Sequence, residues 1–160
     1  MRCDVTHEPA HTLVLGCGND LRGDDALGPM VIDRVASLLA DRDDVTVEVC
    51  CGLTPELADT LSRVDRLIFV DCAAQGDPGV VQRTALMPQR NADIACVHLL
   101  DLPALLTWTQ HLFGRAPSAI AFSVAGERFE LSESLSPRVA AAMPELVDAV
   151  LAELGVASHA

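Results

Sequence analysis

Apolar and polar residues alternate along the first half of the chain in a pattern that predicts two strand–helix pairs. Thr12–Gly16 is a short apolar run that ends in glycine, which indicates a buried strand. Pro29–Ala40 places its large apolar side chains on one helical stripe, with proline in the first turn, where helices tolerate it. Val45–Cys50 alternates like a second strand. Residues 54–56 (Thr-Pro-Glu) then provide a cap, a first-position proline and a first-turn acid for a helix that ends near Arg63.

The second half of the chain continues this alternation of strands and helices, except that two predicted strands follow each other directly. Leu67–Val70 is apolar throughout, as in a central strand buried on both faces, and we expect Asp71 to end that strand. Residues 72–78 are too few for a parallel crossover, so a strand at Val80–Met87 is predicted to run antiparallel to the strand before it. Three more elements follow: a helix from a cap at Asp101 to Gly114, a strand at Ala119–Val124, and an amphipathic helix at Pro137–Leu154.

This order of elements predicts the fold class. Strands that alternate with helices form α/β proteins, in which helices cover both faces of a mostly parallel sheet. We therefore expect a three-layer sandwich with a mixed, mostly parallel, twisted sheet of about five strands. Residues 1–11 show no periodicity and are expected to form a flexible N-terminal extension. Residues 12–160 are long enough for one domain with a single core, and we expect a monomer because that core accounts for the apolar stretches.

Composition narrows the possible functions and the cellular location. The formal net charge is −12, which repels phosphate backbones and anionic lipid, so neither nucleic acid nor a membrane surface is expected as a partner. All the basic residues are arginine and tyrosine is absent, which excludes Schiff bases, a Walker-type lysine and tyrosyl acid–base chemistry. No apolar window is long enough for a membrane span, and the N-terminus lacks the order of a signal peptide. We expect a cytoplasmic protein.

The densest chemical signal is the glycine-rich loop from Gly16 to Asp25, Gly-Cys-Gly-Asn-Asp-Leu-Arg-Gly-Asp-Asp, which leaves the first strand and precedes the first long helix. A dinucleotide loop needs a third glycine where this chain has Leu21, and the loop's three aspartates would repel a pyrophosphate. A nucleotide-binding α/β domain is therefore the weaker interpretation. Acids at a helix N-terminus also complement the helix dipole without further function.

Three residues from distant segments are candidates for a divalent metal site. Asp71 falls at the carboxyl end of a central strand, where open α/β sheets bind ligands, and the loop with Asp25 leaves the first strand at the same edge. His98 follows a strand that ends at the opposite edge, but about ten intervening residues span roughly 30 Å and can bring it back. Two acids and one imidazole suit zinc, nickel or a similar cation with water in the open positions. Each residue also has an ordinary alternative as a cap or a loop histidine.

The cysteines offer a second chemistry. Six are present without CxxC spacing, so we expect reduced and mostly buried thiols. Cys17, Cys72 and Cys96 flank the predicted edge of the sheet, and a thiolate beside His98 would be an activated nucleophile. Cysteine is more often a small core residue, which makes this the weaker hypothesis.

The chain resembles the nickel-iron hydrogenase maturation proteases from about residue 12 to residue 154. The resemblance rests on four blocks in a fixed order: Leu15–Pro29, Phe69-Val70-Asp71 followed by Gly76–Gly79, His98 with Asp101-Leu102, and Leu135–Val139. Three positions depart from the usual pattern, Ala26, Cys72 and Cys96. These departures affect the local loop geometry but not the set of metal ligands.

The resemblance implies a function and a site. The metal-contacting residues of the family fall on Asp25, Asp71 and His98. Such proteins are endopeptidases that remove a C-terminal extension from the hydrogenase large-subunit precursor after nickel insertion, so the precursor is the expected partner. Nickel, carried by the precursor, is the expected recognition mark, and zinc or a similar divalent cation is its expected substitute in the isolated protein. The alternative is a non-proteolytic nickel-binding assembly factor, because no familiar protease nucleophile is present.

Overall fold

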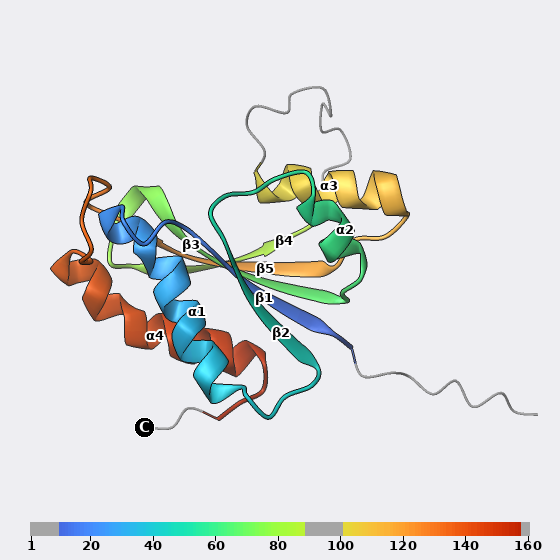
Figure 1. Ribbon diagram of the computed structural model, residues 1–160, viewed down its shortest axis with the longest axis horizontal. Helices are drawn as coiled ribbons and strands as arrows, with labels where there is room; N and C mark the ends of the chain where they lie inside the picture. The colour runs from blue at the N-terminus through green and yellow to red at the C-terminus, as the bar shows by residue number, and fades with distance from the viewer. Residues whose placement is uncertain (1–9, 89–100, 158–160) are drawn as a thin grey trace, which may run out of the picture.

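Five strands and four α-helices alternate along residues 10–88 and 101–157, the parts of the chain that the structure, a computed structural model, describes (Figure 1). Their bounds are β1 (Thr12–Cys17), α1 (Leu27–Leu38), β2 (Val45–Cys50), α2 (Leu57–Ser62), β3 (Arg66–Pro78), β4 (Val81–Leu86), α3 (Leu102–Phe113), β5 (Ser118–Ala125) and α4 (Pro137–Glu153). A 3-10 turn, η1 (Gly23–Ala26), leads directly into α1. The predicted order of strands and helices is confirmed.

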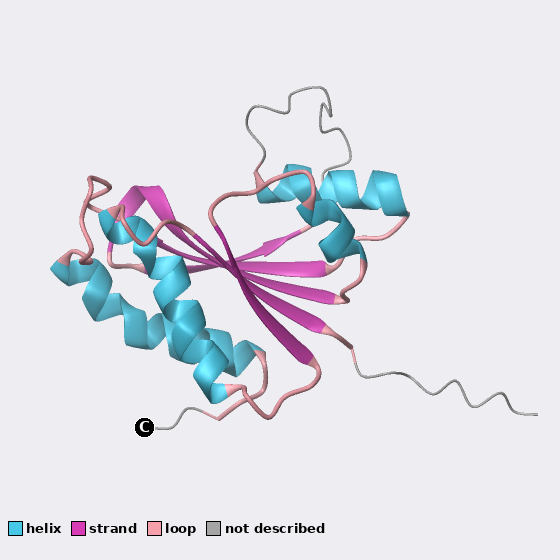
Figure 2. Cartoon of the chain, viewed as in Figure 1, coloured by secondary structure: helices cyan, strands magenta, loops and turns pink. Residues whose placement is uncertain are grey.

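The strands form one mixed sheet in the order β2-β1-β3-β5-β4. β1 pairs in parallel with β2 and β3, β3 pairs in parallel with β5, and β4 alone runs antiparallel along β5. Helices α1 and α4 cover one face of this sheet, and α2 and α3 cover the other (Figure 2). The predicted three-layer α/β sandwich with a mostly parallel sheet is therefore confirmed.

Alternation along the strands divides the core into two halves. Successive side chains of a strand point to opposite faces, and Val14 and Ile68 accordingly pack with α1 and α4, whereas Leu15 packs with α2 and α3. These residues are at most 1% exposed, as expected for central strands of a sheet that helices cover on both faces.

β3 corrects one prediction, because Asp71 does not end the strand. β3 continues to Pro78, and its pairing with β5 is interrupted between Ala73 and Pro78. The strand is buried up to Cys72 and then emerges into solvent, so the apolar pattern detects only its buried half. The following strand is antiparallel as predicted, but it pairs with β5 and not with β3.

Helix ends agree with the sequence where a side chain caps them. The Asp101 carboxylate accepts a hydrogen bond from the Ala104 amide at 2.8 Å, and Gly114 ends α3 in the left-handed conformation at φ 74°. The predicted cap of α2 is wrong: Thr54 lies in a turn, where its carbonyl accepts from the Leu57 amide, and the helix begins at Leu57. α1 begins two residues before Pro29 because η1 continues into it.

His11 connects the predicted extension to the sheet. Its amide donates to an Asp65 carboxylate oxygen at 3.0 Å, and its ring nitrogen Nε2 lies 2.7 Å from the Thr46 hydroxyl. Its carbonyl accepts from the amides of Asp65 and Arg66. The hydrogen-bond network of the domain therefore includes the last residue of the predicted extension, whereas residues 1–9 lie outside the described chain. Within the described ranges, no helix is both long enough and apolar enough to cross a membrane.

Two glycines allow α1 to approach β1 at van der Waals distance. A Cβ on Gly16 would lie 2.8 Å from the Gly28 carbonyl oxygen, and a Cβ on Gly28 would overlap the Cys17 carbonyl oxygen. Both obstacles are backbone atoms, which a rotamer change cannot move. This contact fixes where α1 begins and therefore where the preceding loop lies.

Gly28→Ala should lower the free energy of unfolding by about 2–4 kcal/mol, because the added methyl group forces α1 away from β1. Gly52→Ala is the matched control, since a Cβ at Gly52 meets no atom within 4 Å. Urea unfolding monitored by circular dichroism measures both variants. Equal stability of the two variants would contradict the close contact.

Candidate active site

Four side chains form a row across the sheet, level with the last residues of β1 and β2. Cys17 pairs in register with Cys50, Asp71 pairs with Ser123, and the β1–β3 register places Cys17 next to Asp71. The row continues the face that α2 and α3 cover, because Leu15 and Phe69 precede Cys17 and Asp71 by two residues. The apolar face of the sheet thus ends in thiols, a carboxylate and a hydroxyl.

Asp71 is a carboxyl group largely withdrawn from water. Burial and, to a smaller extent, the neighbouring negative charge of Asp25 together raise its pKa to about 6. One donor opposes this effect: the Cys72 amide donates to Asp71 Oδ1 at 2.8 Å. Among the described residues no cationic side chain forms an ion pair with Asp71. Such a carboxylate is well suited to bind a cation.

Asp25 reaches the same end of the sheet from η1. Its amide donates to the Arg22 carbonyl and its carbonyl accepts from the Asn19 amide, each at 3.2 Å. Its negative charge raises the pKa of both Asp71 and Cys17. Gly18 has φ 148°, and a Cβ there would overlap the Asp25 carbonyl oxygen. Glycine at this position therefore allows the loop to fold back on itself. Because Gly18 follows Cys17 in the sequence, this contact brings the Asp25 backbone beside the end of β1.

Asp24 has a different role, which its pattern in the sequence does not reveal. Its side chain is fully buried and accepts four hydrogen bonds. The donors are the amides of Glu127, Arg128 and Ser136 and the Ser136 hydroxyl, at 2.6–2.9 Å. Burial alone would raise the pKa of Asp24, but these donors outweigh it and lower the pKa. Asp24 thus joins the β1–α1 loop to the β5–α4 loop, and this connection fixes the position of Asp25.

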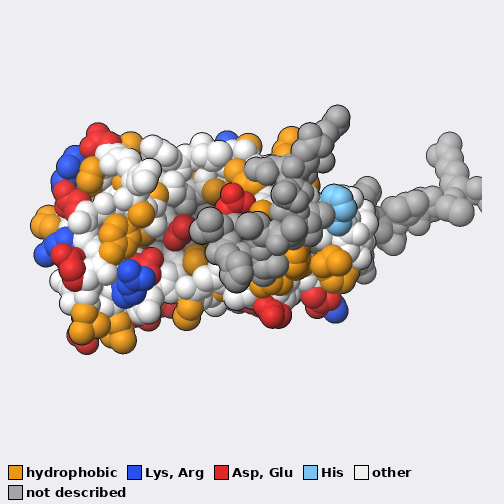
Figure 3. Space-filling model, turned by 90° about the horizontal axis from the view of Figure 1, so that it is seen from above, with side chains coloured by type: hydrophobic (Ala, Val, Ile, Leu, Met, Phe, Trp, Pro, Cys, Tyr) orange, Lys and Arg blue, Asp and Glu red, His pale blue; other side chains and the backbone are white. Residues whose placement is uncertain are grey.

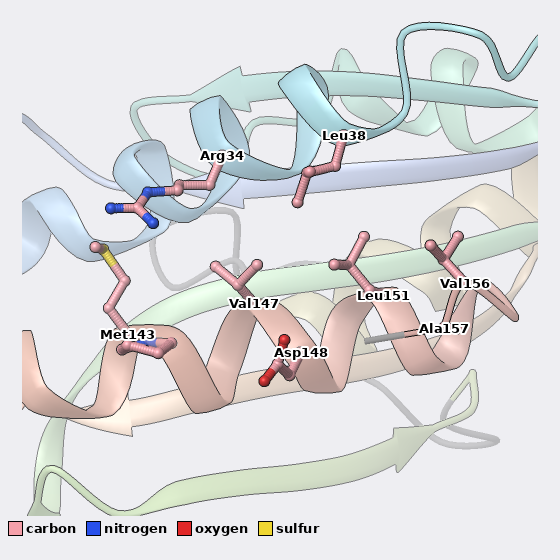
Figure 4. Close-up of a pocket in the computed structure, with 9 residues that line it drawn as sticks. Arg34, Leu38, Met143, Val147, Asp148, Leu151, Val156 and Ala157 are labelled. Carbon is pink, nitrogen blue, oxygen red and sulfur yellow. The ribbon is translucent and has the colours of Figure 1, made fainter. Parts of the chain in front are cut away.

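A cavity of about 420 Å³ adjoins Asp71 on the face covered by α2 and α3. Its lining comes from strand ends and from the start of α3: Cys17, Leu53, Phe69, Asp71, Leu86, Asp101, Leu102, Ala121, Phe122 and Ser123. A second cavity, of about 350 Å³, lies on the other face, between Arg34 and Leu38 of α1 and Met143, Val147, Asp148 and Leu151 of α4 (Figure 4). Only the first cavity contains one of the predicted site residues.

His98, the third predicted residue, lies outside the described residues, as does Cys96. The described chain resumes at Asp101, which lines the same cavity as Asp71. Within residues 10–88 and 101–157 no three His, Cys, Asp or Glu side chains lie close enough to hold a metal ion. Asp25 and Asp71 therefore form at most part of a metal site.

Cys17 and Cys72, two of the three candidate thiols, do not resemble an activated nucleophile. Cys17 and Cys50 are hydrogen-bonded to each other, which raises the pKa of Cys17 and lowers that of Cys50. Burial, together with the nearby carboxylates, raises the pKa of Cys72 to about 12. Cys17 and Cys72 are thus thiols at neutral pH, which weighs against the cysteine hypothesis for these two residues.

Comparison with solved structures gives similar chains over almost the whole length. A hydrogenase 2 maturation peptidase from Thaumarchaeota archaeon SCGC_AB-539-E09 is 27% identical, with a TM-score of 0.65, and the match covers 92% of this chain and 99% of that one. The NiFe hydrogenase maturation protease HycI from Thermococcus kodakarensis KOD1 is 22% identical, with a TM-score of 0.71 and coverage of 95% and 97%. The hydrogenase maturating endopeptidase HybD from E. coli is 24% identical, with a TM-score of 0.64 and coverage of 91% and 92%.

No protein-family model matches the chain, and no curated protein matches it. The structural neighbours nevertheless confirm the resemblance that the sequence blocks indicate, because they carry the names of hydrogenase maturation peptidases and cover nearly the whole chain. They also support the prediction of a peptidase.

Asp24→Asn should lower the free energy of unfolding by about 2–4 kcal/mol, because an amide nitrogen would replace one oxygen that faces N–H donors. Asp20→Asn is the matched control: it removes the same charge from an exposed position in the same loop and should change stability by less than about 0.5 kcal/mol. Urea unfolding at pH 7.5 measures both. A neutral effect of Asp24→Asn would contradict the connecting role of this residue.

Asp71→Asn should raise stability at pH 7.5 by on the order of 2 kcal/mol. The pKa of Asp71 in the folded protein, about 6, lies above its ordinary value of 3.8, so the charged carboxyl destabilises the fold above pH 6. This destabilisation disappears as the pH falls from about 6 to 3.8, because in this range the folded protein binds the Asp71 proton more tightly than the unfolded chain does. Urea unfolding at pH 7.5 and pH 4 should therefore show a gain at pH 7.5 that shrinks at pH 4. A gain that does not depend on pH would contradict this interpretation.

Proposed function

We propose that this protein is an endopeptidase that removes the C-terminal extension of a nickel-iron hydrogenase large-subunit precursor after nickel has been inserted. The observation that carries the proposal is the pair of carboxylates, Asp25 in η1 and Asp71 in the central strand β3, in a fold shared with named hydrogenase maturation proteases. The resemblance between sequence blocks independently selects the same two residues.

The proposed ligands for the nickel of the precursor are Asp25, Asp71 and His98. The chemistry of the two described ligands fits a divalent cation, because they are neighbouring carboxylates without a cationic partner among the described residues. Carboxylate and imidazole ligands accept nickel or zinc. In the sequence, His98 lies three residues before Asp101. Asp101 caps α3 and lines the cavity beside Asp71. That position supports His98 as the third ligand.

The protein's own residues fix the geometry of this site. Asp71 extends from a central strand, and the Cys72 amide holds one of its oxygens, so the other oxygen is available to the cation. Asp25 is held by the turn that leads into α1. The hydrogen bonds of Asp24 to the β5–α4 loop fix the position of this turn. When bound, the cation supplies a positive charge beside the peptide to be cut. The carboxylates hold the precursor through that cation, so only a nickel-loaded precursor is positioned for cleavage.

The direct test incubates the protein with a nickel-loaded large-subunit precursor from the same organism and measures the precursor's mass. Loss of the C-terminal extension with the wild-type protein supports the proposal. Asp25→Asn, Asp71→Asn and His98→Ala should each reduce the rate at least about 100-fold, whereas Asp20→Asn should retain it. Circular dichroism of each variant establishes that it is folded.

Other outcomes distinguish the alternatives. Binding of the precursor without shortening would favour a non-proteolytic assembly factor. Full activity of a ligand variant would remove that residue from the site. Cys17→Ser, Cys72→Ser and Cys96→Ser should remain active, and loss of activity in a folded variant would revive the thiol hypothesis.

A further inference from the structure

Two cysteine thiols lie side by side at the end of the sheet, beside the candidate site. Cys17 and Cys50 are the last residues of β1 and β2, and they pair directly in the parallel register. Their thiols are hydrogen-bonded to each other, and both side chains pack on the face that α2 and α3 cover. The proposed cleavage of the precursor uses neither thiol.

The spacing of this pair is close to that of a disulfide. Neighbouring strands lie about 4.7–4.9 Å apart, and the Cα atoms of a disulfide lie about 4.4–6.8 Å apart. The other described cysteines are placed differently, because Cys72 packs on the opposite face with α1 and α4, and Cys51 lies beyond the end of β2. Cys50 is therefore the partner that the register gives to Cys17.

Cys50 is the member of the pair that has room to move. β2 is an edge strand of the sheet, and Cys50 is partly exposed. A Cβ at Gly52, two residues further along, meets no atom within 4 Å. The backbone of Cys17, by contrast, packs closely against α1, because a Cβ on Gly28 would overlap the Cys17 carbonyl oxygen. A bond between the two sulfurs is shorter than their hydrogen bond, so forming it moves the end of β2 toward β1.

The loop that follows β2 borders the cavity beside Asp71. This loop, residues 51–56, arches over the upper side of the sheet toward α2 in Figure 1. Its residue Leu53 lines the cavity together with Cys17 and Asp71. Leu53 is three residues from Cys50 in the chain. A movement of Cys50 toward Cys17 therefore displaces Leu53 and changes the shape of the cavity.

The surroundings of the pair favour a small, neutral oxidant. The negative charges of Asp71 and Asp25 both act on Cys17. Figure 3 shows the upper side of the molecule of Figure 1 face-on: acidic side chains lie among apolar ones near its middle, and the visible arginines lie nearer its margins. An anionic oxidant would be repelled by such a surface. Hydrogen peroxide carries no charge and is small enough to reach a partly buried thiol.

We propose that Cys17 and Cys50 are a modification site at which a hydroperoxide forms a reversible disulfide, and that this bond changes the shape of the cavity beside Asp71. The first step is at Cys50, which is more exposed than Cys17. The hydrogen bond from Cys17 also lowers the pKa of the Cys50 thiol, which favours the nucleophilic thiolate.

The reaction consumes one hydroperoxide for each disulfide. The Cys50 thiolate attacks one peroxide oxygen, the O–O bond breaks, and the leaving hydroxide takes up the proton that Cys50 released, which gives a sulfenic acid and water. The Cys17 sulfur then attacks the Cys50 sulfur, and the Cys17 proton leaves with the hydroxyl group as a second water. Two thiols are thus oxidised to one disulfide, and hydrogen peroxide is reduced to two waters.

The first test treats the reduced, full-length protein with hydrogen peroxide and identifies its disulfides by peptide mass spectrometry. The wild type should yield the peptide that joins Cys17 to Cys50, and dithiothreitol should reverse this bond. Cys51→Ser is the matched control, because it removes an exposed thiol next to Cys50 that lies outside the paired strand. This variant should form the bond at the wild-type rate.

Cys17→Ser should stop the reaction at the sulfenic acid of Cys50. When dimedone traps sulfenic acids, Cys50 of this variant should carry at least about tenfold more label than Cys50 of the wild type. Cys50→Ser should form neither the label at position 50 nor the joined peptide. Absence of the joined peptide from the folded wild type, or a disulfide of Cys51 in its place, would overturn the proposal.

The second test measures whether the bond reaches the cavity. Hydrogen–deuterium exchange of residues 51–56 should be at least about threefold slower in the oxidised wild type than in the reduced protein, because the bond fixes the start of this loop to β1. The β5–α4 loop, which Asp24 holds, should exchange equally in both forms. A disulfide that leaves the exchange of residues 51–56 unchanged would overturn the proposed effect on the cavity.

Cleavage of the nickel-loaded precursor is a further readout, and it alone rests on the proposed function. Protein freed of peroxide after oxidation should show a kcat/KM at least about tenfold lower than reduced protein, because the cavity beside Asp71 is altered. Dithiothreitol treatment should restore it, and peroxide should not change the kcat/KM of Cys50→Ser. Equal values for the oxidised and reduced wild type would contradict the proposal. If the reduced wild type does not cleave the precursor, the proposed function fails, and the first two tests still decide the disulfide.

Discussion

The structure of the candidate site depends on the buried carboxylate of Asp24. Isolated negative charges are costly to bury, but four donors from the segment Glu127–Ser136 surround this one and lower its pKa. The same hydrogen bonds join loops that are about one hundred residues apart in the sequence. The position of Asp25 follows from this connection together with the close contact between α1 and β1.

Neighbouring carboxyls in this protein therefore serve opposite purposes. Asp24 is supplied with donors, holds its charge and stabilises the fold. Asp71 has one amide donor, is withdrawn from water and is near the charge of Asp25. Its ionised form therefore destabilises the fold. A group that destabilises the fold yet sits rigidly on a central strand is better explained by what it binds than by what it supports. This contrast supports the proposal that Asp25 and Asp71 bind a cation.

Much of this arrangement can be predicted from the sequence, and the failures have physical causes. Apolar runs and caps predict β1, α3 and α4 closely because burial and capping act locally. The extension of β3 beyond Asp71 is missed because its outer half is exposed and has no apolar pattern. The sequence of the loop contains two adjacent acids, Asp24 and Asp25, but it does not distinguish their roles. Only the long-range hydrogen bonds in the structure show that Asp24 stabilises the fold. The cross-strand pairing of Cys17 with Cys50 depends on register, which the sequence alone does not specify.

The central claim is that Asp25 and Asp71 contact nickel held by the precursor. X-ray absorption at the nickel edge of the loaded precursor, recorded with and without an equimolar amount of this protein, measures that contact directly. The account predicts that the wild-type protein adds oxygen or nitrogen ligands to the nickel and that the double variant Asp25→Asn, Asp71→Asn does not. A nickel spectrum that the wild-type protein leaves unchanged, although the two proteins form a complex, would contradict the account.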